Sequence, residues 1–399
     1  IPHFGRANLT RIPAPSNFLV DSPLQFPISN GIDSMSRIIT FLGDGSRERT
    51  TLAIATAKWF ARQGKRVLLA TYVNPSTELL LETSLSTHPQ SVESHLQVVQ
   101  LQTTVLLEQA WDEVKKLVST YFPDSFSEQI YPAELIILPG FDSFLTFNAL
   151  RQYYQSGSYD VIIYSDRENL EILRMLGIPS ALDWYFRRFH QIFADLDISE
   201  IANSIGGPLA AAILHANIDR QKMQEGLAQI QHWIEQGVAV VNDASQLTAY
   251  LITNDTPEAI ADTRWCWGSA QQINLTVSGV LAYQDRDLSR EAIQSAFTPL
   301  AVHHISTLQE RNWEAIIQEL PDFNASISVT PPLNIDLVQR QVHVFLPGFH
   351  KKQVKLTQSG AEIVIEAGDQ RRQIVLPPEL KGKSVQSGKF EEPYLVISF

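Results

Sequence analysis

The sequence contains a single cysteine, Cys266, in 399 residues. One cysteine excludes an internal disulfide and a Cys-x-x-Cys zinc site, because both need two thiols. We expect Cys266, which stands between Trp265 and Trp267, to be a buried or half-buried helix residue. The sparing use of cysteine fits a reducing compartment.

The sequence also lacks long apolar runs and an excess of basic residues. No run of about 20 apolar residues is present, which argues against a membrane-spanning helix and stable membrane insertion. The formal net charge is -12, whereas a general nucleic-acid binder needs a basic face, so we expect no nucleic-acid partner. The 44% hydrophobic and 19% charged content is typical of a globular protein with a full core.

Residues 1–34 differ in composition from the rest of the chain. They are rich in proline, poor in acidic residues and without clear periodicity, whereas Met35 opens a clean strand. We interpret this segment as an N-terminal extension: an artificial leader, a targeting remnant or a mis-assigned start. It lacks the apolar core of a signal peptide, so we expect no secretion.

Residues 35–325 alternate between short apolar runs and helical segments. Runs without strong alternation are typical of strands buried on both faces, and strands separated by helices predict a parallel doubly wound sheet. Ligands bind such sheets at the carboxyl ends of the strands. The expected strands are Ile38–Leu42, Val67–Thr71, Leu135–Leu138, Asp160–Tyr164, Val238–Val241, Ala249–Thr253 and Thr276–Ala282.

Residues 41–51 have the position and length of a phosphate-binding loop. A hydrophobic strand ends at Leu42 just before the loop, and a helix follows from Thr50 to Arg62. In the form G-K-G-G-x-G-K-T-T, such a loop would bind phosphate through backbone N–H groups, a helix N-terminus and two lysines. Here both lysines and the last glycine are replaced. The loop is therefore either a nucleotide site that works differently or a fold that has lost its site.

Two intervals, 76–131 and 177–237, are too long for simple crossovers and are helical in pattern. Together they predict a helical subdomain above the loop edge of the sheet. Its apolar content exceeds what two crossovers need, which favours a binding groove, although an ordinary helical core explains any single aromatic residue equally well. The candidate groove residues are Leu182, Trp184, Tyr185, Phe186, Phe189 and Phe193.

The chain changes character after Pro331 and Pro332. Residues 333–399 contain short alternating strands punctuated by glycines, which predicts a small antiparallel β-sandwich. The expected strands are Gln341–Leu346, Val354–Leu356, Glu362–Glu366, Gln373–Leu376 and Tyr394–Phe399.

Several stretches beside the loop occur in an order and spacing that resemble one family. They are Ala61–Leu69, Asn74–Pro75, Pro139–Asp142, Tyr159–Tyr164 followed by Leu173–Leu176, and Thr256–Glu258. With these stretches, residues 35–325 resemble the ArsA-type ATPases. These include the arsenite-pump ATPase and the cytosolic ATPase that delivers tail-anchored membrane proteins. The resemblance implies a P-loop NTPase sheet with helical insertions, with ATP and Mg²⁺ as ligands.

The tail resembles the α-crystallin, small heat-shock-like domain attached to some members of that family. The matching pieces are Leu346–Phe349, Arg371–Pro377 and Gly388–Phe390. Members with this tail are similar to a branch found in cyanobacteria and chloroplasts. The resemblance therefore implies a cytoplasmic location of the cyanobacterial type, with the chloroplast stroma as the alternative.

The loop departs from the family pattern at three positions. Asp44 replaces the signature lysine that reaches the partner subunit's nucleotide, and a carboxylate there repels phosphate. Glu48 replaces a glycine where backbone curls around phosphate. Arg49 replaces the main lysine and keeps its positive charge, but its planar fork does not copy a point charge. Thr50 still offers a hydroxyl to magnesium.

Residues outside the loop also depart from the family's nucleotide-site pattern. Asn74 aligns with the switch aspartate that polarises water, but an amide cannot accept the proton. Ser165 aligns with the second metal-side aspartate, and Tyr283 stands where the family has an adenine-reading asparagine. We assign catalytic roles to Asn74, Arg49 and Asp44. The expected nucleotide contacts are Gly43, Gly45, Ser46, Arg47, Glu48, Arg49, Thr50, Thr51, Ser165 and Tyr283.

Two interpretations of the loop remain open. Nucleotide binds weakly through backbone amides, Arg49 and Thr50 with slow turnover, or the loop is a scaffold bridged internally by its own charges. The leading functional hypothesis is a homodimeric targeting factor or chaperone for hydrophobic, tail-anchor-like helices. It would dimerise without the family's zinc clamp. The alternatives are a non-catalytic scaffold and an anion-transport ATPase subunit, although one cysteine argues against thiol coordination of arsenite.

Overall fold

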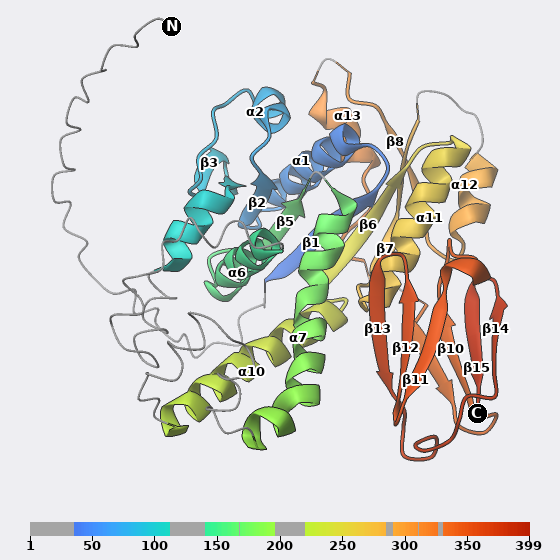
Figure 1. The fold of residues 1–399 in the computed structure, drawn as a ribbon. Coiled ribbons are helices and arrows are strands. Elements are labelled where there is room, and N and C mark those ends of the chain that lie inside the picture. Colours follow the sequence, from blue (N-terminus) through green and yellow to red (C-terminus); the bar gives the residue numbers. More distant parts are fainter. Residues whose placement is uncertain are drawn as a thin grey trace, which may run out of the picture. The chain divides into compact units, whose positions relative to one another are not determined.

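The computed structural model describes residues 36–111, 140–166, 168–195, 220–284, 290–309, 311–325 and 330–399. Its main element is an eight-stranded sheet in the order β3-β4-β2-β5-β1-β6-β7-β8 (Figure 1). Every neighbouring pair in it is parallel except β3 with β4. The strands are β1 (Arg37–Gly43), β2 (Val67–Tyr72), β3 (Gln90–Glu93), β4 (Leu96–Leu101), β5 (Val161–Ser165), β6 (Leu247–Thr253), β7 (Val277–Gln284) and β8 (Val302–Ser306).

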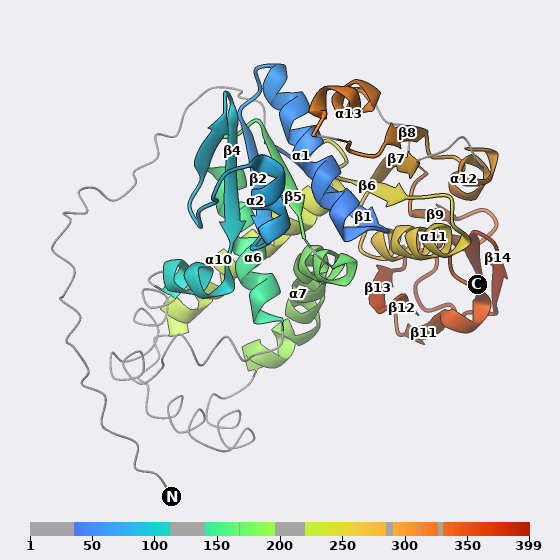
Figure 2. The same cartoon turned by 90° about the horizontal axis from the view of Figure 1, so that it is seen from above.

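Helices cover both faces of this sheet (Figure 2). Alternate residues of β1 show the two sides, since Ile39 packs in one apolar cluster and Ile38 in the other. The cluster that contains Ile39 joins the sheet to α1 (Ser46–Arg62), α2 (Pro75–Leu81) and α13 (Trp313–Glu319). The cluster that contains Ile38 joins the sheet to a helix over 103–111, α6 (Phe141–Gln155), α7 (Asn169–Asp195), α10 (Arg220–Asn242), α11 (Pro257–Gln272) and α12 (Arg290–Phe297).

The predicted fold class is confirmed, with a parallel-dominant α/β sheet followed by an all-β region. The expected strand Val238–Val241 is wrong, because these residues belong to α10. Ile234 and Val241 are 7% and 1% exposed and stand two turns apart on one helix face, so tertiary packing overrides the β-branched run. The expected strand Leu135–Leu138 lies outside the described residues, and β8 was not predicted.

The interval 76–131 is not helical throughout. After α2 it contains β3 and β4, and the helix over 103–111 follows them. The apolar residues of β4 are almost fully buried beside β2, and a short apolar run of this kind does not distinguish a strand from a buried helix segment. Among the described residues, no helix has the length and apolarity needed to cross a bilayer.

Residues 333–399 form an antiparallel β-sandwich, as predicted. A four-stranded sheet has the order β14-β15-β10-β9, and a three-stranded sheet has the order β11-β12-β13. Both sheets contribute to one core, with Val342 and Val344 from the first and Ile363 and Ile365 from the second. The strands are β9 (Leu333–Asp336), β10 (Gln341–Phe345), β11 (Lys355–Ser359), β12 (Glu362–Ala367), β13 (Gln370–Val375), β14 (Ser387–Glu391) and β15 (Tyr394–Ser398).

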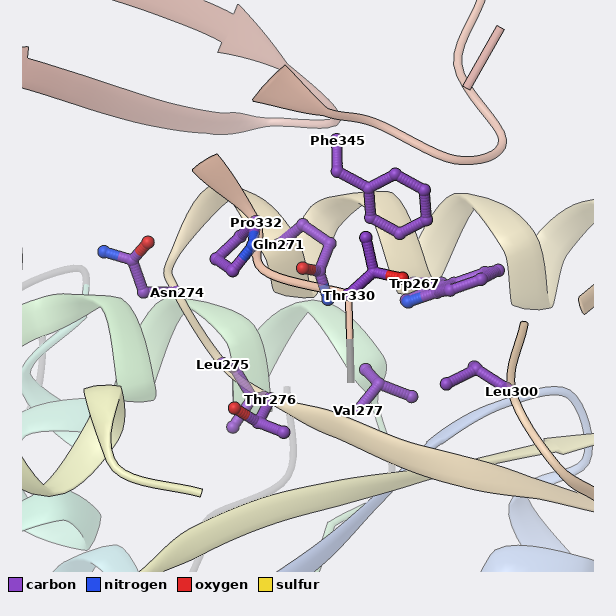
Figure 3. A pocket seen from close by; sticks show the side chains of 10 residues that line it. All are labelled: Trp267, Gln271, Asn274, Leu275, Thr276, Val277, Leu300, Thr330, Pro332 and Phe345. Carbon is purple, nitrogen blue, oxygen red and sulfur yellow. The ribbon is translucent and has the colours of Figure 1, made fainter. Parts of the chain in front are cut away.

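The sandwich packs directly on α11. Gly268 makes the close approach possible, because a Cβ atom there would lie 2.2 Å from the carbonyl oxygen of Pro347. At the preceding residue, the Trp267 ring meets the Phe345 ring edge to face at 5.2 Å (Figure 3). The cavity beside these rings has a volume of only about 20 Å³. The α/β region and the sandwich therefore share a tightly packed seam along α11.

Candidate nucleotide-binding site

The loop between β1 and α1 lies at the carboxyl edge of the sheet, between the ends of β5 and β6. Two glycines give it its shape, since Gly43 has φ +115° and Gly45 has φ +77°. A Cβ atom at Gly43 would lie 2.1 Å from the Ile252 carbonyl oxygen, so the loop rests directly on β6. Gly45 caps α1 without a side chain, which leaves the first N–H groups of α1 facing the loop.

The Arg49 side chain turns back into the loop rather than out to solvent. It is 4% exposed, and its Nη1 donates to the carbonyl oxygen of Gly43 at 2.6 Å. Burial lowers the pKa of Arg49, while neighbouring acidic groups, Glu168, Asp166 and Asp44 among them, oppose that shift. Arginine stays protonated in proteins, so the loop holds a buried positive charge supplied by its own helix.

Asn169, at the start of α7, binds both backbone groups of Gly43. The Gly43 N–H donates to Asn169 Oδ1 at 3.0 Å, and Asn169 Nδ2 donates to the Gly43 carbonyl oxygen at 2.9 Å. That carbonyl oxygen thus accepts from both Asn169 and Arg49. Two donors on one carbonyl hold the entrance of the loop in a fixed orientation.

The Asp44 carboxylate is bound along the edge of the sheet, at the ends of β6 and β7. Its Oδ2 accepts from the Tyr283 hydroxyl at 2.8 Å and from Asn254 Nδ2 at 3.1 Å. Asn254 Nδ2 also donates to the Tyr283 hydroxyl at 3.0 Å. Burial, followed by the bond to Asp44, raises the pKa of Tyr283, so the phenol stays a donor at neutral pH. The two predicted site residues Asp44 and Tyr283 therefore come together.

Glu48, Thr50 and Thr51 lie in the first turns of α1, with Ser46 and Arg47 exposed at its start. A Cβ atom at Gly45 would lie 2.6 Å from Glu48 Oε2, so this carboxylate folds over the loop. The Thr50 hydroxyl donates to the Ser46 carbonyl oxygen at 3.0 Å. The lone pairs of that hydroxyl oxygen remain suited to a magnesium ion.

The remaining predicted residues lie at neighbouring strand ends. Ser165 ends β5 and is 4% exposed, and the next residue, Asp166, accepts from the Tyr164 hydroxyl at 2.5 Å. Asn74 caps α2, where its Oδ1 accepts from the Ser76 N–H at 2.8 Å. Of the described residues, Ser76 is the only hydrogen-bond partner of the Asn74 side chain in the structure, so its catalytic assignment stays a prediction.

Sequence reasoning missed four residues that contact the loop. They are Asn169, Asn254, Thr263 and Cys266. Thr263 on α11 accepts from the Asp44 N–H at 3.3 Å and donates to the Ile252 carbonyl oxygen at 2.9 Å. Cys266 is 2% exposed, as expected, and lies beside Arg49 and Gly43. Asn169 and Asn254 are polar residues that closely follow buried strands, and that position was the available signal.

The anion-transporting ATPase family profile matches residues 36–297, about two thirds of the chain. This chain belongs to the ArsA family. A second profile, the HSP20-like domain found in ArsA, matches residues 339–399, which confirms the resemblance of the tail. Membership implies an ATPase that uses ATP with Mg²⁺ in general.

Full-length relatives agree with this assignment. A protein of Chlorobaculum tepidum, named as a candidate arsenical pump-driving ATPase, is 21% identical over 91% of this chain and 96% of its own. A similarly named protein of Aquifex aeolicus is 21% identical over 90% of this chain and 99% of its own. A third, from Prosthecochloris vibrioformis, is 21% identical over 91% and 96% of the two chains.

The loop of this ArsA-family protein fits ATP with Mg²⁺ in its backbone but less well in its side chains. The α1 N-terminus, Arg49 and the Thr50 hydroxyl are the groups that would hold phosphate and metal. The carboxylates of Asp44 and Glu48 lie at the same loop and oppose phosphate. Arg49 must also exchange its bond to Gly43 for a phosphate oxygen.

The expected groove residues lie on α7, away from the loop. Trp184 Nε1 donates to Glu362 of the sandwich at 3.2 Å, so this aromatic belongs to the seam. Tyr185 is 51% exposed, and Leu182 and Phe186 are half-buried. The side chains of Phe189 and Phe193 lie outside the described residues. A groove formed by this set stays a prediction.

Proposed function

We propose that this protein is a degenerate ArsA-type ATPase that binds and hydrolyses ATP weakly and acts as a homodimeric holding or targeting factor for hydrophobic segments. One observation supports the weak nucleotide cycle above others: the loop's own side chains occupy its binding groups. Arg49 is bound to the Gly43 carbonyl oxygen, and Asp44 is bound to Tyr283. ATP therefore competes with contacts that are already made.

The charge of Asp44 sets how far ATP binding is weakened. A unit charge about 5 Å from a phosphate charge contributes about 1–3 kcal/mol at the effective dielectric constants of protein surfaces and partly buried sites. Asp44 is repulsive where the family lysine is attractive. We therefore infer an ATP affinity in the high-micromolar range or weaker, with turnover limited by the loop rather than by supply of nucleotide.

Exposed aromatics on the helices that cover the sheet face opposite α1 favour the client-binding part of the proposal. Phe144 on α6, Tyr185 on α7 and Trp233 on α10 are 43%, 51% and 36% exposed. The three helices belong to one layer, because α6 and α10 both pack against α7. We assign the apolar partner to this layer because it carries three large exposed apolar side chains. A transmembrane helix has the chemistry to cover it.

Co-expression with a reporter that ends in a transmembrane helix tests this function. We expect the reporter to co-purify with the full chain, while a reporter with a scrambled polar tail does not. Phe144→Ser combined with Tyr185→Ser should lower the recovered reporter at least about fivefold, because both remove exposed apolar area. Val338→Ser is the matched control, since Val338 is 93% exposed in the sandwich.

Analytical ultracentrifugation of the chain without reporter tests the dimer, whose mass should be twice the 44.8 kDa of one chain. Equal recovery of the apolar and polar reporters would leave the scaffold interpretation standing. Recovery that the double variant does not change would show that the client binds elsewhere.

A further inference from the structure

A second pocket lies at the other end of α11, where α7, α10 and β13 meet. Its volume is about 350 Å³, large enough for a small organic molecule. Four arginines and one aspartate are among the side chains that line it, in a chain whose net charge is -12. The arginines are Arg174, Arg187, Arg371 and Arg372. This local excess of positive charge opposes the charge of the whole chain.

Two of the arginines are already neutralised, and two are not. Arg174 pairs with Asp369 at 3.0 Å, and Arg187 pairs with Asp183 at 2.9 Å. The Arg371 guanidinium lies over the Trp184 ring at 5.2 Å. Arg372 donates to the carbonyl oxygens of Gln271 at 3.1 Å and Pro332 at 3.3 Å, and also to Asn274. Within the described part of the chain, neither Arg371 nor Arg372 has a carboxylate partner.

The strand pattern of β13 also departs from simple packing. Gln370 and Arg372 alternate with Arg371 and lie on the same strand face as Ile374, which belongs to the sandwich core. Gln370 and Arg372 are polar, although Ile374 on the same face is part of the core. They are nevertheless buried, with 8% and 6% exposure. Burial of Arg372 lowers its pKa to about 10. Buried polar groups of this kind need partners.

Two buried amide atoms at this pocket lack partners among the described residues: Gln370 Nε2, a donor, and Gln272 Oε1, an acceptor. Gln272 Nε2 donates to the Ile365 carbonyl oxygen at 3.3 Å, which fixes the orientation of that amide. Gln272 is 2% exposed and lines the pocket, so its oxygen lies in the pocket wall rather than at the protein surface. The pocket thus presents uncompensated positive charge, a free donor and a free acceptor.

We propose that this pocket binds a small organic anion with a phosphate or carboxylate group and at least one hydroxyl donor. Arg371 and Gln370 Nε2 recognise the anionic group, and Gln272 Oε1 accepts from the hydroxyl. The site is separate from the loop between β1 and α1, because it adjoins the last turn of α11 while Thr263 and Cys266 of that helix adjoin the loop. It does not rest on the proposed function.

Isothermal titration of the full chain with glycerol 3-phosphate and with glycerate tests the proposal. Binding of either anion is expected, with glycerol itself silent and inorganic phosphate weaker than glycerol 3-phosphate because phosphate lacks the hydroxyl arm. Arg371→Gln and Gln370→Leu should each weaken binding at least tenfold. Lys381→Gln is the matched control, since it removes the same charge from an exposed position in the sandwich and should change affinity less than twofold.

The titration also separates this pocket from the loop, where a phosphate could bind at the α1 N-terminus. Thermal melting first confirms that each variant is folded. Binding that is lost in Arg371→Gln and Gln370→Leu but kept in Arg49→Ala supports the pocket. Binding that is lost only in Arg49→Ala, or no heat with either anion at millimolar concentration, would overturn the assignment.

Discussion

The residues that hold the loop between β1 and α1 come from distant parts of the chain. Asp44 meets Asn254 and Tyr283, which are 210 and 239 positions away, and Gly43 meets Asn169, 126 positions away. The departures that we propose at 44, 48 and 49 come from the sequence, because the motif fixes their spacing. Their partners could not, because only the parallel order of β5, β1, β6 and β7 brings these strand ends together.

Cys266 offers a chemical test of this packed arrangement. Burial raises the pKa of its thiol to about 12, and the thiolate is the form that alkylates. At pH 8 the native thiol is therefore almost wholly protonated. We expect iodoacetamide to label native protein at least about a hundredfold more slowly than protein in urea, since an exposed thiol has a pKa of about 8.5.

The labelling rate should rise with pH well beyond pH 9, where a free thiol would level off. N-acetylcysteine in the same tube controls for the reagent, and Cys266→Ser controls for labelling elsewhere. Similar native and unfolded rates at pH 8 would show that Cys266 is accessible, and that the contact of α11 with the loop is not as described.

At the scale of elements, α11 serves both regions of the protein. Its middle contacts the loop through Thr263 and Cys266, and its later turns carry the sandwich through Gly268 and Gln271. The sequence predicted the strand on either side of this helix, because those strands are short, apolar and bounded by turns. It did not predict the seam, because nothing in the sequence shows that Pro347 packs against Gly268.

Other elements show where a pattern is insufficient. The expected strand at Val238–Val241 is helical, because its branched residues continue the buried face of α10. β9 and β14 were missed because they are short edge strands with few buried residues. By contrast β10 and β15 follow the alternation predicted for a sandwich, and β12 was predicted although Ile363, Val364 and Ile365 are all buried.

Gly268→Ala tests the seam along α11. The added Cβ would lie 2.2 Å from the Pro347 carbonyl oxygen and 2.6 Å from the Phe349 ring. Backbone cannot move aside easily, so we expect a loss of about 2 kcal/mol or more in the free energy of unfolding. Urea unfolding followed by tryptophan fluorescence measures it, because Trp265 and Trp267 lie at the seam.

Gly177→Ala on α7 is the matched control. Its nearest neighbour would be the Ile273 Cγ2 methyl at 3.3 Å, a tight side-chain contact that can yield by a few tenths of an ångström, and Ala favours a helix over Gly, so the change should stay within about 1 kcal/mol. Equal stability of the two variants would contradict the close packing of the sandwich on α11.

At the scale of the whole molecule, the ArsA-family frame is kept while the nucleotide loop is restrained. The parallel-dominant sheet and the crystallin-like tail agree with the family, and the full-length relatives share this extent. We propose that Asp44, Glu48 and Arg49 set this loop apart from the family motif. We therefore propose slow ATP chemistry at a loop held by its own side chains, and client binding by the helices on the other side of the sheet from α1.

The ATP affinity of the wild-type chain, compared with that of Asp44→Asn, tests this claim most directly. Titration calorimetry with MgATP should give a dissociation constant of about 0.1–1 mM for the wild type. Asp44→Asn should bind at least about fivefold tighter, because it removes about 1 kcal/mol of repulsion from phosphate. Glu379→Gln, an exposed change of the same charge in the sandwich, should have no effect.

Hydrolysis measured on the same samples completes the test. Arg49→Ala should lower the ATPase rate at least tenfold, because it removes the loop's buried positive charge. We expect weak wild-type binding that Asp44→Asn strengthens, and a rate that Arg49→Ala lowers at least tenfold. Submicromolar wild-type affinity that Asp44→Asn leaves unchanged, or a rate that Arg49→Ala leaves unchanged, would contradict this expectation.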